Sequence, residues 1–134
     1  MFLLDTDCLS ELIKKSPSEK LLDHLENHPA DSFVTTSITV MELRCGALRV
    51  PQPAVFWGRV DKEILSHLKI LPFDQEAAME AGNILSHLYK KGEPIGSEDV
   101  MIAAIAKRYG ATVITGNVRH FGRVPGLQVQ NWIR

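Results

Sequence analysis

The sequence predicts an α/β fold in which helices cover a central, mostly parallel sheet of about five strands. Three observations lead to this prediction. The chain opens with a continuous apolar run, Phe2-Leu3-Leu4, that ends abruptly in Asp5, as expected for a strand buried on both faces. Residues 111–115, Ala-Thr-Val-Ile-Thr, form a second short apolar and β-branched run. Between them, strand-like segments alternate with helical segments of about 10 to 15 residues, the pattern of βαβ units with right-handed crossovers.

The first part of the chain contains two predicted strands, at residues 2–5 and 32–36. The second is rich in β-branched and aromatic residues, which favour strands. After the first strand, Asp7 is a suitable N-cap for a helix. Another helix is expected to begin at Ser16, which has capping-box spacing to Glu19.

The middle of the chain continues this alternation. Ser37 is expected to cap a helix that ends before Pro51, and residues 54–67 carry apolar side chains at helical spacing. A short third strand is predicted at residues 69–72.

The last part of the chain is predicted to contain two long helices and two strands. Asp74 is expected to cap a helix that Gly92 closes, and Ser97 a helix that stops at Gly110. The remaining elements are predicted in chain order as a strand at 111–115, a helical turn at 119–121 and an edge strand at 127–130.

Length and composition favour one globular domain spanning residues 1–134. No apolar run approaches the roughly 20 residues of a membrane span, and the N-terminus does not read as a signal peptide. Cys8 and Cys45 are not in a CxxC pair, so we expect two free, buried thiols in a cytoplasmic protein. The formal net charge of −1 gives no global attraction to nucleic acid, so any such binding needs a local basic patch.

Four polar residues are expected to meet at one edge of the sheet: Asp5, Glu42, Asp99 and Asn117. Alone, each has an ordinary explanation as a helix cap, a boundary residue, a first-turn acid or a turn residue. In a parallel sheet, however, strand ends and the N-terminal halves of the following helices share one edge. Three carboxylates placed together there need a compensating cation.

The ligands of such a site restrict both the cation it can bind and the reaction it can support. Hard oxygen ligands are those that Mg²⁺ or Mn²⁺ takes, and no His/Cys set has zinc spacing. A divalent cation would suit phosphodiester hydrolysis, in which it polarises the phosphoryl group and lowers the pKa of a bound water. The sequence does not choose between one ion and two.

Five motifs, in this order, resemble the PIN-domain family, and in particular the VapC toxins of bacterial VapBC toxin–antitoxin pairs. The motifs span nearly the whole chain: Leu3-Leu4-Asp5-Thr6-Asp7, Ser37-Ile38-Thr39-Val40-Met41-Glu42-Leu43, Pro94-Ile95-Gly96-Ser97-Glu98-Asp99, Ile114-Thr115-Gly116-Asn117-Val118-Arg119-His120-Phe121 and Leu127-Gln128-Val129-Gln130-Asn131-Trp132. The resemblance implies a PIN-like α/β/α sandwich and a Mg²⁺- or Mn²⁺-dependent ribonuclease. It also implies inhibition by a VapB-type antitoxin, and homodimers are common among such toxins.

On the matching positions, the resemblance makes Asp5, Glu42 and Asp99 the metal-site acids and Asn117 the fourth catalytic residue. Two departures from the family pattern stand close to these positions. Asp7 occupies a place where the family usually has Asn, which adds an acid near the site. Glu98 precedes Asp99, and a shift of one residue would exchange their roles; the spacing from Pro94-Ile95-Gly96 favours Asp99.

Several further residues could support the site or contact RNA. Thr6 and Thr115 stand at strand ends, where a hydroxyl could orient water or phosphate or simply close a turn. Arg49 would share a helical face with Glu42 if that helix extends so far. The other candidate RNA contacts are Arg44, Lys90, Lys91, Arg119, His120 and Arg123, each of which could also be ordinary surface charge. A role for His120 as general base is disfavoured by its basic surroundings.

Three alternatives compete with the nuclease interpretation. A phosphoacceptor receiver domain needs an acceptor Asp after its third strand and a Lys after a later strand. Pro72-Phe73-Asp74 is a poor acceptor site, and Thr115-Gly116-Asn117 lacks the Lys. A nucleotide-binding module lacks both GxxxxGK[ST] and GxGxxG. A degenerate PIN domain that only binds RNA or protein stays open, although all the matched acids are present.

Overall fold

The strand β1 (Phe2–Leu4) lies at the centre of a five-stranded sheet. A computed structural model describes all of residues 1–134. The strand order is β3-β2-β1-β4-β5, and every pair is parallel. The other strands are β2 (Phe33–Thr36), β3 (Lys69–Leu71), β4 (Thr112–Ile114) and β5 (Val129–Gln130). The predicted parallel sheet of about five strands, with the last strand at an edge, is confirmed.

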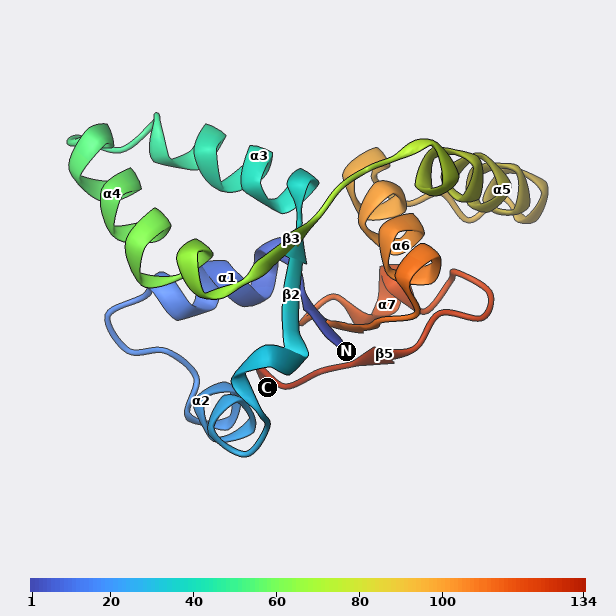
Figure 1. Cartoon of the computed structure of the whole chain (residues 1–134). Helices are drawn as coiled ribbons and strands as arrows, with labels where there is room; N and C mark the ends of the chain where they lie inside the picture. Colours follow the sequence, from blue (N-terminus) through green and yellow to red (C-terminus); the bar gives the residue numbers. More distant parts are fainter.

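Helices cover both faces of this sheet, as Figure 1 shows, with α1, α3 and α4 on one side and α5, α6 and α7 on the other. The predicted α/β/α sandwich is therefore confirmed. The helices are α1 (Thr6–Ile13), α2 (Glu19–Glu26), α3 (Ser37–Ala47), α4 (Pro53–Glu63), α5 (Gln75–Lys91), α6 (Ser97–Tyr109) and α7 (Val118–Phe121). None of them is both long and apolar enough to cross a membrane.

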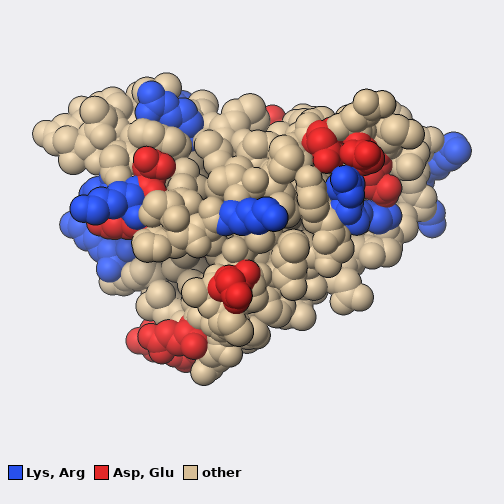
Figure 2. All heavy atoms as spheres, in the orientation of Figure 1, with Lys and Arg blue, Asp and Glu red and all other residues tan.

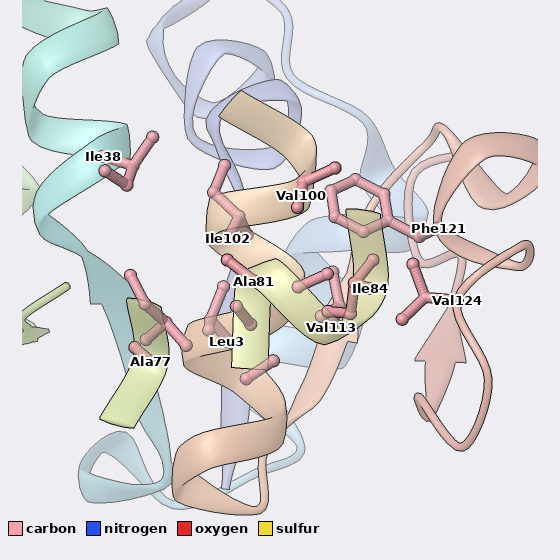
Figure 3. Close-up of a cluster of buried hydrophobic side chains, with 14 of the residues drawn as sticks. Leu3, Ile38, Ala77, Ala81, Ile84, Val100, Ile102, Val113, Phe121 and Val124 are labelled. Atoms are coloured by element: carbon pink, nitrogen blue, oxygen red, sulfur yellow. The ribbon is translucent and has the colours of Figure 1, made fainter. Parts of the chain in front are cut away.

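Neighbouring side chains of the short strands belong to two separate hydrophobic cores, one on each face of the sheet. In β1, Leu3 belongs to the core beneath α5 and α6, whereas Leu4 belongs to the core beneath α1, α2 and α4. Successive side chains of a strand point to opposite faces, so a three-residue strand supplies both cores. Figure 3 shows the first core, where Phe121 of α7 and Val113 of β4 lie near Val100 of α6. The central strands are thereby fixed on both faces.

Two helices begin earlier than predicted, because the extended residue at the end of the strand, or directly after it, is the N-cap. Asp5, not Asp7, caps α1, and its Oδ1 accepts a hydrogen bond from the backbone N–H of Cys8 at 2.8 Å. Thr36, not Ser37, caps α3. In both places the polar side chain at the strand end reaches the free N–H groups of the first turn.

Other local predictions also need correction. The predicted capping box at Ser16 is wrong, because Ser18 caps α2. Gly96, not Ser97, is the cap position of α6. The helix predicted over 54–67 ends at Glu63 and is followed by a 3₁₀ turn, Leu65–His67.

The cysteines agree only in part with the prediction, whereas the long helix α5 agrees with it at both ends. Both cysteines are free, as predicted, but Cys45 is exposed on α3, so the expectation of two buried thiols holds only for Cys8. Asp74 caps α5 and Gly92 closes it with a left-handed φ of 65°, as predicted.

Gly110 and Gly58 should respond to alanine with opposite signs. Gly110 closes α6 with φ 69°, and no atom stands within 4 Å of where a Cβ would lie. Gly110→Ala should therefore lower the free energy of unfolding by about 1–2 kcal/mol for backbone conformation alone. Gly58 lies inside α4 and is equally uncrowded. Gly58→Ala should therefore raise the free energy of unfolding by about 0.5–1 kcal/mol. Urea unfolding of both variants tests this, and destabilisation of both would contradict it.

Candidate functional site

The carboxyl ends of β1 and β4 form the crevice of this sheet. From β1 the chain proceeds outward to β2 and β3, whereas β4 lies on the other side of β1 and leads to β5. Adjacent strands whose connections run to opposite sides leave such a crevice outside their carboxyl ends. Asp5, Thr6 and Asp7 follow β1, and Gly116 and Asn117 come shortly after β4. The sheet topology thus explains why residues far apart in sequence share one place.

A polar cavity of about 420 Å³ occupies this crevice, with a single apolar residue, Ile102, in its lining. The structure brings together in its wall all four residues predicted to converge. The lining residues are Asp5, Thr6, Asp7, Glu42, Asp99, Ile102, Gly116, Asn117 and Arg134. Glu42 is contributed by α3 and Asp99 by the first turn of α6. The N-terminal halves of these helices therefore face the strand ends, as the parallel sheet requires.

Asp5 is the most buried acid of the cavity, with 3% of its surface exposed. Its pKa is raised to about 7, first by burial and then by the charges of Asp7 and Asp99. Hydrogen bonds from Thr115 and the Cys8 backbone partly oppose this rise. A carboxylate placed in low dielectric beside other carboxylates is stabilised by a cation. Asp5 thus combines a structural role as the α1 cap with a strained electrostatic environment.

Asp99 lies beside a small polar group formed with His120 and Asn117. Its Oδ2 is 3.6 Å from His120 Nδ1, and the same ring nitrogen is 3.0 Å from Asn117 Nδ2. Burial raises the pKa of Asp99, while His120 lowers it. His120 Nδ1 therefore faces Asn117 and Asp99 rather than the middle of the cavity, where a general base would stand.

The remaining acids are each held by a neighbour. Glu42 Oε1 accepts a hydrogen bond from the Thr6 hydroxyl at 2.6 Å, which gives Thr6 its predicted place beside the site. Asp7 Oδ2 accepts from the backbone N–H of Gly116 at 3.0 Å. Asp7 therefore links the loop after β1 to the loop after β4.

The donor set of the cavity fits a hard divalent cation. Its ligands are all oxygens, and the pKa values of Asp5 and Asp99 are both raised by burial and by neighbouring acids. A cation would relieve this repulsion. No three Asp, Glu, His or Cys side chains are gathered closely enough to hold an ion as they stand. Holding an ion with three of these side chains therefore requires them to move closer together.

Other predicted residues lie outside the cavity. Glu98 is not in its wall and accepts instead from Ser97 Oγ. The helix α3 ends at Ala47, so the condition that placed Arg49 on the face of Glu42 is not met. Arg119 is exposed on α7, and Thr115 is fully buried, where its hydroxyl accepts from the Asn117 N–H at 2.9 Å. On the face in Figure 2, basic and acidic side chains are interspersed without a broad basic field.

Arg134 is the one charged lining residue that sequence reasoning missed. It lies in the wall of the cavity, 18 positions after Gly116, and its Nη2 lies 3.4 Å from the Gly116 carbonyl oxygen. The only signal in the sequence was the resemblance of the segment just before it, Leu127–Trp132, to the family.

The fold and cavity define a class: an α/β protein with an acidic site at the switch point of a parallel sheet. The PIN domain family model matches residues 2–127. The chain is 36% identical over 131 residues to a "tRNA(fMet)-specific endonuclease VapC" of Salmonella typhimurium, covering 98% of this chain and 97% of that one. It is equally similar to "Ribonuclease VapC2" of Haemophilus influenzae, at 36% over 132 residues and 98% of both chains.

A solved structure agrees with these sequence relatives. A chain of the DNA-bound VapBC from Salmonella typhimurium superimposes with a TM-score of 0.88 and 36% identity, over 98% of this chain and 97% of that chain. The chain belongs to the PIN-domain family. The family membership excludes the receiver-domain and nucleotide-binding alternatives.

Proposed function

We propose that this protein is a divalent-metal-dependent endoribonuclease and the toxin of a type II toxin–antitoxin pair. The observation that supports this best is the cavity in which Asp5, Glu42, Asp99 and Asn117 come together at the carboxyl ends of β1 and β4. The named relatives are ribonucleases, and nucleases of the PIN family generally use a divalent metal. Residues 1–134 would form one PIN domain.

In this proposal, Asp5, Glu42 and Asp99 hold the metal ion. The bound cation would polarise the scissile phosphoryl group and lower the pKa of the attacking water. The protein's own residues prepare these ligands. Thr6 fixes Glu42 through a hydrogen bond of 2.6 Å, and burial of Asp5 strengthens its attraction to a cation.

Asn117 and His120 complete the arrangement. Their contact of 3.0 Å places the Asn117 side chain beside Asp99. Asn117 would orient water or a phosphate oxygen through its amide. His120 would fix the direction of Asp99, since partners of this kind orient metal ligands.

Mg²⁺ is the proposed ion, with Mn²⁺ able to replace it, because both prefer oxygen ligands. The proposed compartment is the cytoplasm, which suits the free thiols Cys8 and Cys45. The proposed partner is a VapB-type antitoxin, supported by the similarity to the VapBC structure. A homodimer stays a prediction, which sedimentation analysis of the purified toxin tests.

Cleavage of total cellular RNA by purified protein tests the activity. The reactions contain Mg²⁺, Mn²⁺ or EDTA, and the products are mapped by sequencing their ends. Metal-dependent cuts at defined sites are expected. A tRNA such as the one named for the Salmonella relative is one substrate to look for among the products.

A matched pair of variants decides the role of neighbouring acids. Asp99→Asn should reduce the cleavage rate by more than about tenfold, whereas Glu98→Gln should stay close to wild type, because only Asp99 lines the cavity. A larger loss of cleavage in Glu98→Gln than in Asp99→Asn would make Glu98, not Asp99, the metal-site acid. Absence of cleavage by folded, antitoxin-free protein would favour a PIN domain that binds RNA or protein without catalysis.

A further inference from the structure

Arg134 is the only basic residue in the wall of the acidic cavity. Its guanidinium lies against the bare backbone of Gly116: a Cβ at that position would stand 2.6 Å from Arg134 Nη2 and 2.5 Å from Asp7 Oδ2. The side chains of Asp7 and Arg134 thus approach from either end of the chain to the same glycine. The absence of a side chain at Gly116 makes room for both.

The backbone that carries Arg134 is anchored by several contacts. The Oδ1 of Asn131 accepts hydrogen bonds from the N–H groups of Ile133 at 2.8 Å and Arg134 at 3.2 Å. Ser18, the cap of α2, donates its hydroxyl to the Ile133 carbonyl, and Lys20 Nζ donates to the Arg134 carbonyl at 3.0 Å. These bonds fix the position from which the guanidinium reaches the cavity.

Buried side chains strengthen this anchor. Trp132 and Ile133 are 2% and 6% exposed, and the Trp132 ring stacks on His24 of α2 with centroids 4.5 Å apart. Arg134 itself stays exposed. The buried side chains of Trp132 and Ile133 thus anchor the backbone that carries the exposed, charged side chain of Arg134.

The donors of that side chain are largely unused. Arg134 makes no ion pair within 4.0 Å of any carboxylate, and its one side-chain hydrogen bond is that to Gly116. The pKa of Glu11 is lowered mainly by its hydrogen bond with Lys14, and the charge of Arg134 makes the smallest contribution to that lowering. A guanidinium has five N–H donors in a fixed fork, so most of them point to solvent or to the cavity.

We propose that Arg134 is a phosphate-binding residue for the RNA substrate at the mouth of the acidic cavity. This inference rests on the proposed function. Four carboxylates repel a polyanion, and a fixed positive charge at the rim offsets that repulsion. The planar fork of Arg binds two oxygens of one phosphate, which would position the RNA backbone next to the metal-site acids.

The test compares Arg134→Ala and Arg134→Lys with Arg59→Ala. Arg59 is an exposed arginine of α4 outside the cavity, so Arg59→Ala controls for the loss of one charge. The probe is a short, mixed-sequence, fluorescein-labelled RNA, and its binding is followed by fluorescence anisotropy in EDTA over a series of salt concentrations. All variants keep the backbone bonds of residue 134, and thermal melts verify their folding.

Arg134→Ala is expected to raise the Kd by about tenfold or more, the size of one charged hydrogen-bonding contact. The slope of log Kd against log salt should fall by about 0.7, the value for one phosphate contact on a single strand. Arg134→Lys should keep the slope and recover only part of the affinity. In Mg²⁺ cleavage assays, Arg134→Ala should raise KM with little change in kcat, and Arg59→Ala should resemble wild type.

Two results would overturn the inference. One is an Arg134→Ala protein with the same Kd and salt slope as Arg59→Ala. The other is tighter binding or faster cleavage, which would mean that the guanidinium obstructs the cavity. Both require wild-type protein that binds and cuts RNA. If wild type does neither, the proposed nuclease function fails instead, so the two failures are distinguishable.

Discussion

Asp5→Asn is expected to lower kcat/KM for metal-dependent RNA cleavage by more than about a hundredfold, beyond the typical cost of losing an outer-sphere partner of a metal ligand. Asp5 is the buried acid at the tip of the central strand, where burial and two neighbouring acids raise its pKa to about 7. An amide cannot supply the negative charge that draws a cation into this position. The loss should therefore appear at every Mg²⁺ concentration that supports wild-type cleavage.

The Asn substitution separates the effect on chemistry from an effect on folding. Asp5 caps α1 by accepting from the Cys8 N–H, and Asn can accept the same bond, whereas Ala would cost about 1 kcal/mol of stability. Asp61→Asn, at an exposed position of α4, is the matched control and should cut RNA like wild type. Undiminished cleavage by folded Asp5→Asn would show that Asp5 is not a metal ligand.

The parts of the site that could be predicted are those fixed by topology. Once β1 and β4 are recognised as parallel strands, Asp5 and Asn117 must stand at the same edge. Glu42 and Asp99 follow because the N-terminal halves of α3 and α6 lie at that edge as well. The prediction needed only the order of elements and the periodicity of their apolar residues.

The parts that could not be predicted depend on contacts between distant segments. Arg134 reaches the cavity because Asn131, Ser18 and Lys20 fix the tail, and no local pattern in the sequence encodes those contacts. The choice of Thr36 over Ser37 as the cap of α3 depends on where β2 stops. Adjacent polar residues have similar capping preference, so strand register decides between them.

The second large effect is on stability, and it has the opposite sign to the effect on activity. The pKa of Asp5 is raised in the folded protein from its ordinary value of 3.8 to about 7. Below about pH 4 the carboxyl is protonated in both states and costs nothing. Between about pH 4 and pH 7 it ionises only when the chain unfolds, so the folded state loses stability as pH rises through this window.

Asp5→Asn should therefore be more stable than wild type at pH 8 in EDTA. A pKa shift of one unit corresponds to about 1.4 kcal/mol, which gives an upper limit of about 4 kcal/mol for this gain. Urea unfolding at pH 4 and pH 8 measures it: the difference between variant and wild type should be small at pH 4 and large at pH 8. Because both proteins share every other titrating group, the difference isolates Asp5 and its coupling to Asp7 and Asp99.

A divalent cation should reduce this difference in stability. In the proposed function Mg²⁺ binds the folded wild type and not the unfolded chain, so it should raise wild-type stability at pH 8 according to its concentration and Kd. Asp5→Asn, which lacks the proposed ligand, should gain less. An equal difference between the two proteins at pH 4 and pH 8 in EDTA would contradict the raised pKa of Asp5. If the pH dependence appears but Mg²⁺ stabilises both proteins equally, Asp5 is a strained buried acid and the cation binds elsewhere.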